Sequence, residues 1–340
     1  MSGPAPEVGA ELAALLDAAR QGRARAVGRL VSLVENDAPV LPALMRRLAA
    51  DTGRARVIGL TGAPGVGKST TVAALVTSLR ADGQRVAVLA VDPSSPFSGG
   101  ALLGDRVRMQ QHALDGGVFI RSMATRGHLG GLAVAAPQVI RVLSAAGFDT
   151  VVVETVGVGQ SEVEVAGQVD VTVVLLAPGM GDGIQAAKAG VLEIGDVFVV
   201  NKADRDGAHA VVRELRAMVA LADRETGEWK PPVLRTSATD GTGVAELLAE
   251  LDRFAAHAAA SGLGRRRREA RARREVESLV IARLRAELPA RGGPDLDEVA
   301  AAVAAGRLDA YTAADRVLSR PTEAEAPLEG ELRASGGVAP

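Results

Sequence analysis

The chain has 340 residues, 47% of them hydrophobic and 2% aromatic, and its formal net charge at pH 7 is −2. This length suits one principal core with additions at its ends. The small charge gives no general attraction to nucleic acid or to an anionic membrane surface. The sequence contains no cysteine, which excludes disulfides, thiolate metal sites and cysteine nucleophiles.

The segments that would direct a chain to or through a membrane are not recognisable in this sequence. The first twenty residues lack the basic start and continuous apolar region of a secretion signal. No apolar run approaches the roughly 20 residues that span a bilayer. We therefore expect a cytoplasmic protein whose partners include neither membrane nor nucleic acid.

The predicted elements begin with a helical region over residues 6–50, broken at 37–39 by Asp-Ala-Pro. Residues 51–260 then alternate short β-rich runs with helical stretches, which indicates a parallel sheet wound with crossover helices on both faces. The seven runs are VIGL, RVAVLAV, VFIRS, TVVVE, VTVVLLA, DVFVVN and PVLRTS.

A helical arm is predicted over residues 261–320, after the linker SGLG at 261–264. Val276, Val280 and Leu284 share one face of its first helix with two further leucines. Residues 321–340 contain few apolar groups, and we expect this tail to be disordered.

A phosphate-binding loop follows the first β-rich run, where GAPGVGKST satisfies G-x-x-x-x-G-K-[ST] and opens a helical pattern. The glycines let backbone N–H groups surround a β-phosphate, the lysine adds positive charge, and the serine offers a hydroxyl to Mg²⁺. The alternative is a glycine-rich turn before a helix. The residues assigned to this loop are Gly62, Ala63, Pro64, Gly65, Val66, Gly67, Lys68, Ser69 and Thr70. The chain is therefore predicted to be an α/β P-loop NTPase with N-terminal and C-terminal helical extensions.

The nucleotide base is predicted from the N-K-x-D motif formed by Asn201, Lys202 and Asp204. The Asp204 carboxylate can accept hydrogen bonds from guanine N1–H and from its N2 amino group, whereas adenine lacks this donor pair. A later strand ends near Ser237, Ala238 and Thr239, where a backbone N–H could reach guanine O6. Alone, the motif would equally be a surface turn, but together the two elements favour GTP over ATP.

Acidic residues at strand ends are candidates for a Mg²⁺ site. Glu154 ends one run and Gly157 follows it three residues later, the spacing in which many GTPases hold Mg²⁺ through water and bind the γ-phosphate with a glycine N–H. Asp92 ends another run, and Asp105 follows it across a long loop rich in proline and glycine. These two aspartates would complete the metal shell and polarise the attacking water, unless they only cap a turn and a helix.

Taken together, GAPGVGKST, VDPSSPFSGGALLGDRVRM, RGHLGGL, ETVGVGQSE, APGMGDGIQAAKAG and NKAD closely resemble the MeaB/ArgK family of GTPases, which includes the methylmalonic aciduria type A protein. The resemblance covers about residues 55–260 in detail. It implies a homodimer that binds GTP and GDP with Mg²⁺ and serves a coenzyme B12-dependent acyl-CoA mutase, most often methylmalonyl-CoA mutase. Such proteins gate adenosylcobalamin loading and protect the mutase from inactivation.

The resemblance also implies roles for individual residues. Lys68 and Ser69 would bind phosphate and Mg²⁺, with Asp92, Asp105 and Glu154 around the metal. Asp182, Gln185 and Lys188 would form a third switch that couples the client to hydrolysis. Lys188 could equally be a solvated helix lysine.

Nine arginines between residues 265 and 285 leave three interpretations open: an RNA contact, a solvated face, or a dimer or client contact. The apolar stripe on the same helix favours the dimer or client contact.

Two other functions remain as alternatives for the whole chain. They are a metal-delivery GTPase, which the lack of cysteine disfavours, and a transport-associated kinase, which the guanine motif disfavours.

Overall fold

The computed structural model describes residues 6–51, 53–92, 112, 114–124, 131–155, 166–179, 191–221 and 227–318. Its centre is a seven-stranded sheet in the order β3-β2-β4-β1-β5-β6-β7, in which every neighbouring pair of strands is parallel. All seven strands predicted from the sequence are therefore confirmed. The strands are β1 (Arg56–Thr61), β2 (Val86–Asp92), β3 (Val118–Ala124), β4 (Thr150–Thr155), β5 (Val171–Leu176), β6 (Val197–Val200) and β7 (Val233–Arg235).

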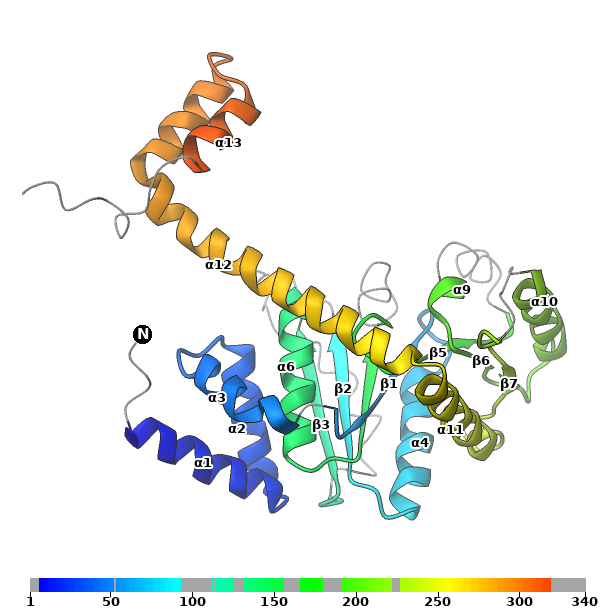
Figure 1. Ribbon diagram of the computed structural model, residues 1–340. Coiled ribbons are helices and arrows are strands. Elements are labelled where there is room, and N and C mark those ends of the chain that lie inside the picture. Colours follow the sequence, from blue (N-terminus) through cyan, green and yellow to red (C-terminus); the bar gives the residue numbers. More distant parts are fainter. Residues whose placement is uncertain are drawn as a thin grey trace, which may run out of the picture. The chain divides into compact units, whose positions relative to one another are not determined.

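Helices cover both faces of the sheet, as the sequence predicts (Figure 1). Successive residues of a strand point to opposite faces. Ile58 packs with helices α4 (Lys68–Ala81) and α11 (Val244–Ala260), while Val57 packs on the other face with α6 (Gly131–Ala145). Helix α10 (Ala208–Leu221) packs against β5, β6 and β7. Because both faces are buried around the centre of the sheet, strands such as β5 (VTVVLL) and β6 (VFVV) are buried over their whole length rather than on alternate residues.

The N-terminal helical region is part of this core. Helices α1 (Pro6–Arg20), α2 (Ala24–Glu35) and α3 (Leu41–Leu48) precede a short 3₁₀ turn, Ala49–Asp51. Their apolar residues, including the fully buried Leu30 and Leu44, form one cluster with α6 and the sheet. Arg121 of β3 forms an ion pair with Glu35 of α2. The predicted break at 37–39 is confirmed, and a second break that was not predicted falls at Gly22, whose positive φ of 81° ends α1.

Helix α12 (Leu263–Ala304) begins the predicted C-terminal arm and continues past Pro289 and Pro294. The chain divides within it into two compact units, residues 1–276 and 277–340. In the second unit α12 is followed by α13 (Ala310–Leu318), whose first turn is capped by the Asp309 carboxylate through the Tyr311 and Thr312 amides. The predicted domain boundaries at 51, 261 and 321 remain predictions.

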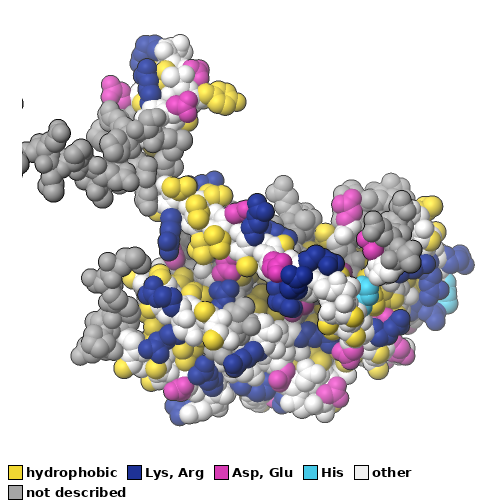
Figure 2. All heavy atoms as spheres, in the orientation of Figure 1, with side chains coloured by type: hydrophobic (Ala, Val, Ile, Leu, Met, Phe, Trp, Pro, Cys, Tyr) yellow, Lys and Arg dark blue, Asp and Glu magenta, His cyan; other side chains and the backbone are white. Residues whose placement is uncertain are grey.

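Several apolar side chains of α12 are exposed. Val276, Val280, Ile281 and Leu284 each keep at least half of their surface in contact with solvent. Figure 2 shows hydrophobic side chains gathered along this helix. Within the described part of the chain, no helix is both long and apolar enough to cross a membrane.

Arginines in the first turns of α12 bind the residues that precede β5 and β6. Arg267 forms two hydrogen bonds of 2.8 Å with the Asp196 carboxylate, and the pKa of its guanidinium is raised chiefly by this contact. Arg271 Nη2 lies 2.6 Å from Asp170 Oδ1, and Arg274 Nη1 donates to the Gly167 carbonyl. These bonds attach the start of the helix to the sheet.

The arginine–aspartate contact continues into an aromatic cluster. The Trp229 indole N–H donates to the Asp196 carbonyl at 2.8 Å, and its ring meets Phe254 edge-on at 5.2 Å between centroids. The Arg267 guanidinium lies over the Phe254 ring at 5.3 Å. The same arginine therefore holds a carboxylate and an aromatic face.

We expect Arg267→Met to lower the free energy of unfolding by about 2 kcal/mol, because it leaves the buried Asp196 carboxylate without its cation. Arg265→Met is the matched control. It removes a solvent-exposed pair with Glu269 on the same helix, and its effect should stay within about 0.5 kcal/mol. Urea unfolding measures both variants, and equal losses would show that the Asp196 pair adds no stability.

Candidate functional site

The phosphate loop connects β1 to α4 and depends on two glycines. A Cβ at Gly62 would lie 2.3 Å from the Leu175 carbonyl oxygen, so no side chain fits there. Gly67 has a φ of 94°, and a Cβ on it would lie 2.5 Å from the Asn201 amide nitrogen. The loop therefore passes close to the ends of β5 and β6, and it delivers the N-terminus of α4 with its free backbone N–H groups.

Lys68 is the first residue of α4 and is largely buried. Its Nζ donates to the Gly62 carbonyl at 2.7 Å and to the Ala63 carbonyl at 3.1 Å. Both acceptors belong to the phosphate loop, so the ammonium group is held against the backbone of that loop. A phosphate in this loop would meet a positive charge together with the amides of the helix N-terminus.

Ser69 and Glu154 form the next contact of the site. The Ser69 hydroxyl donates to Glu154 Oε1 at 2.7 Å, and both residues are buried at the carboxyl ends of the strands. A hydroxyl and a carboxylate are the oxygen donors that Mg²⁺ prefers. The pairing predicted for the metal site is thus brought together by the fold, and its donors fit that ion.

The other two carboxylates predicted for the metal are only partly placed. Asp92 closes β2, one residue beyond Val91, which pairs with Thr155, so its backbone lies at the same edge of the sheet as Glu154. Its side chain and the whole of Asp105 are outside the described residues. Among described residues, no group of three or more His, Asp or Glu side chains has the arrangement of a metal site.

Asn201 joins the guanine motif to the phosphate loop. Its amide Nδ2 donates to the Val66 carbonyl at 2.8 Å, while its Oδ1 accepts from Thr236 Oγ1 at 3.1 Å and from the Ala238 amide at 3.2 Å. Both the asparagine and the threonine are buried. One side chain therefore fixes three loops relative to each other.

Lys202 makes a second link to the phosphate loop. Its Nζ donates to the Gly65 carbonyl at 2.6 Å, and its backbone adopts a positive φ of 56°, which is uncommon for a residue other than glycine. Asp204, two residues later, is exposed. The predicted base reader is thus a solvent-facing carboxylate on a turn whose first two residues are bonded to the phosphate loop.

The loop after β7 is shaped by a residue that the sequence motifs do not assign. Asp240 accepts from the Thr242 amide at 2.9 Å and from Ser237 Oγ at 3.0 Å, and these bonds, the amide first, lower the pKa of its carboxyl. Ser237 Oγ also lies 3.3 Å from Thr239 Oγ1. The Asp-Gly pair at 240–241 is a turn signal that could have identified this residue.

Gly157 and the three residues of the predicted third switch, Asp182, Gln185 and Lys188, lie outside the described residues. Thr70 lies in α4, next to Ser69.

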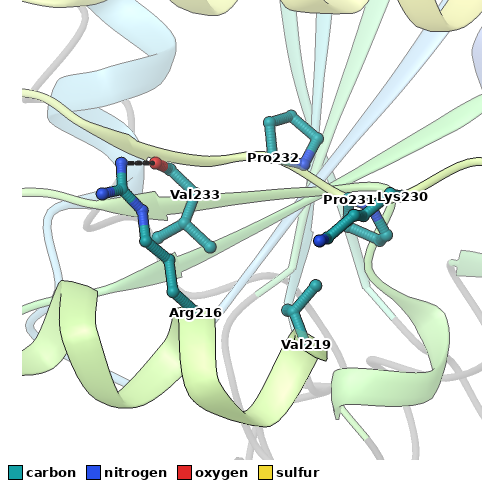
Figure 3. A pocket seen from close by; sticks show the side chains of 6 residues that line it. All are labelled: Arg216, Val219, Lys230, Pro231, Pro232 and Val233. Atoms are coloured by element: carbon teal, nitrogen blue, oxygen red, sulfur yellow. Dashed lines mark hydrogen bonds between the residues drawn. The ribbon is translucent and has the colours of Figure 1, made fainter. Parts of the chain in front are cut away.

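A surface pocket of about 320 Å³ lies between α10 and the terminal strand β7, apart from the phosphate loop (Figure 3). Arg216 extends from α10 and donates to the Val233 carbonyl at 3.4 Å. Pro231 and Pro232, which precede this strand, have no N–H to offer. Arg216 and the two prolines lie at the edge strand β7, where they oppose the pairing of a further strand with it.

Most of the chain is similar in sequence to known proteins. The sequence model of the family described as "Methylmalonyl Co-A mutase-associated GTPase MeaB" matches residues 27–292. A putative GTPase of Pyrococcus horikoshii is 44% identical over 309 residues, which are 90% of this chain and 97% of the relative. The mouse protein named "Methylmalonic aciduria type A homolog, mitochondrial" is 41% identical over 208 residues, which are 60% of this chain and 50% of the relative.

The fold is also that of a solved protein. The crystal structure of a "LAO/AO transport system kinase" superposes with a TM-score of 0.65 at 31% identity, covering 93% of this chain and 98% of that one. The resemblance inferred from the motifs is therefore confirmed. Because the match runs through the phosphate loop, the loops after β6 and β7 and the helices beyond, the chain belongs to the MeaB family of GTPases, whose reaction is GTP hydrolysis.

Proposed function

We propose that this GTPase is a chaperone of a coenzyme B12-dependent acyl-CoA mutase, most simply methylmalonyl-CoA mutase, and that it gates adenosylcobalamin loading and protects the mutase from inactivation. The observation that supports this client is the family match across residues 27–292, whose description names an association with that mutase. The similarity to the mouse methylmalonic aciduria type A homolog agrees with it.

The hydrolytic part of the proposal rests on the geometry of the phosphate loop. The loop amides and the Lys68 ammonium would surround the β- and γ-phosphates and offset the charge that spreads over the γ-oxygens as the bond to the leaving phosphate breaks. Ser69 and Glu154 would hold Mg²⁺ together with Asp92 and Asp105, and the bound ion supplies further charge neutralisation. Asp105 would also polarise the attacking water.

The switching part of the proposal concerns residues on both sides of the nucleotide. We assign the γ-phosphate contact to the Gly157 N–H, and the coupling of hydrolysis to the client to Asp182, Gln185 and Lys188.

We also propose that the exposed apolar side chains of α12 are covered by a second copy of the chain in a cytoplasmic homodimer. Burying Val276, Val280, Ile281 and Leu284 would remove their apolar surface from water.

The kinase named for the superposed structure is the competing function. It is disfavoured by the guanine side of the site. Asn201 and Lys202 are bonded to the phosphate loop, which supports our assignment of Asp204 as a reader of two guanine donors that adenine does not have.

Asp204→Asn should shift preference from GTP toward xanthosine triphosphate, because an amide can pair with the O2 of xanthine but cannot accept both guanine donors. We expect GTP affinity to fall about 100-fold, measured by calorimetric titration. Asp206→Asn, an exposed aspartate two residues later, carries the same charge change and should bind GTP normally. Unchanged GTP affinity in Asp204→Asn would remove guanine recognition from this residue.

Lys68→Ala should lower the rate of phosphate release at least about 100-fold, since the γ-phosphate loses the charge that stabilises the transition state. Circular dichroism should show an intact fold. Lys230→Ala, which removes an exposed lysine beside β7, should keep the full rate. A folded Lys68→Ala protein with normal phosphate release would refute the phosphate assignment.

The client is tested by capture from native lysate of the source organism, with and without a non-hydrolysable GTP analogue. We expect a B12-dependent acyl-CoA mutase to be retained in a nucleotide-dependent manner, and the purified mutase to raise the GTPase rate. Failure of every acyl-CoA mutase of that organism to bind or stimulate the protein would defeat the client assignment while leaving the GTPase intact.

A further inference from the structure

Two buried threonines at the nucleotide end of the sheet have no assigned part in binding phosphate, metal or base. Thr61 closes β1 and Thr155 closes β4, and their side chains are almost completely removed from solvent. The Thr155 hydroxyl lies 3.1 Å from Thr61 Oγ1 and 3.5 Å from the Leu60 carbonyl. The buried Thr155 hydroxyl thus donates toward the Thr61 hydroxyl and the Leu60 carbonyl, as a buried donor requires.

The hydroxyl contact begins where the backbone pairing of these strands stops. The register between β1 and β4 runs from Arg56 opposite Thr150 to Leu60 opposite Glu154. Thr61 and Thr155 are each one residue beyond the last pair. Their side-chain bond therefore continues the attachment between the two strands at the point where both chains leave the sheet.

The chain neighbours of each threonine belong to the nucleotide site. Thr61 precedes Gly62, whose carbonyl binds Lys68 Nζ. Thr155 comes directly after Glu154, which binds Ser69, and lies two residues before Gly157. The hydroxyl bond thus directly links the strand that enters the phosphate loop to the strand that leads toward the proposed γ-phosphate contact.

We infer that Thr155 is a positioning residue for GTP hydrolysis and acts through its bond to Thr61. The bond fixes the end of β4 relative to the phosphate loop, at the point where the chain continues toward the proposed γ-phosphate contact. This inference rests on the proposed role of Gly157. GDP lacks a γ-phosphate, so its binding depends on the phosphate loop and the guanine loops but not on this bond.

A purely structural role would predict something different. Threonine is common in strands because its branched side chain suits a pleated surface, and valine has nearly the same shape. If the hydroxyls only fill space and satisfy each other, their removal should alter stability without a selective effect on turnover.

The test compares threonines at opposite ends of the same strand. Thr155→Val removes the hydroxyl near the nucleotide. Thr150→Val removes an equally buried hydroxyl, bonded to Gln84 Oε1 at 2.8 Å, at the far end of β4. For each variant we would measure kcat and KM for GTP, the Kd for GDP, and the free energy of unfolding in urea.

We expect similar losses of stability in the two variants but a selective loss of turnover. In Thr155→Val, kcat should fall about tenfold, with KM and the GDP Kd changing less than about threefold. Thr150→Val should keep the wild-type kcat. Thr155→Ser, which retains the hydroxyl, should restore kcat to within about twofold.

The double variant Thr61→Val/Thr155→Val guards against misfolding, because it leaves neither hydroxyl without a partner. Its kcat should be as low as that of Thr155→Val alone, since both changes break one bond. Wild-type kcat in the double variant, or an equal loss of kcat in Thr150→Val, would overturn the inference. Absence of GTP hydrolysis by the wild-type protein would instead contradict the GTPase function, so the two failures are distinguishable.

Discussion

The nucleotide site depends on the side-chain amide of Asn201. Its two ends face opposite loops, since Nδ2 donates to the phosphate loop and Oδ1 accepts from the loop that follows β7. A buried amide left without partners would be costly, so each loop is held where the amide needs it. The parallel sheet supplies the starting points, because the carboxyl ends of β1, β6 and β7 open at one edge. The Asn201 side chain thereby gives the phosphate loop and the loops after β6 and β7 a defined arrangement.

The amino ends of the strands are held by different chemistry. There the contacts are between cations and carboxylates, and they attach α12 to the chain just before β5 and β6. Arg141 of α6 adds a two-point pair with Glu275, at 3.0 and 3.1 Å. Several of the nine arginines that left RNA open as an interpretation of the sequence are therefore used inside the molecule. The structural role of Arg267 and Arg271 weakens the case for nucleic acid more directly than net charge does.

Much of the fold could be predicted because its signals are local. Most strands are apolar runs bounded by polar residues, glycine or proline, and the phosphate loop and guanine motif are fixed-spacing strings next to such runs. The break at Gly22 was missed because a single glycine without proline beside it also occurs inside helices. Helix α12 continues past two prolines, although proline and glycine disfavour a helix interior, so local sequence signals do not indicate this continuation.

The contacts within the site were less accessible from sequence. Asn201 and the Val66 carbonyl are 135 residues apart, and Arg267 and Asp196 are 71 apart. Spacing along the chain carries no information on such pairs. Thr61 and Thr155 carry no functional signal in the sequence, because threonine is common in β-strands for its branched side chain alone. Asp240 was missed for a related reason, since a turn aspartate bonds its own loop and resembles any other turn.

The single tryptophan of the chain has a consequence for experiment. The Trp229 ring packs against Phe254, and its indole N–H donates to the backbone carbonyl of Asp196, whose carboxylate binds Arg267. Its emission is therefore free of contributions from other indoles and senses the junction between the sheet and the C-terminal helix. The protein carries its own optical probe of that junction, and spectroscopy can follow it in the unlabelled wild-type chain.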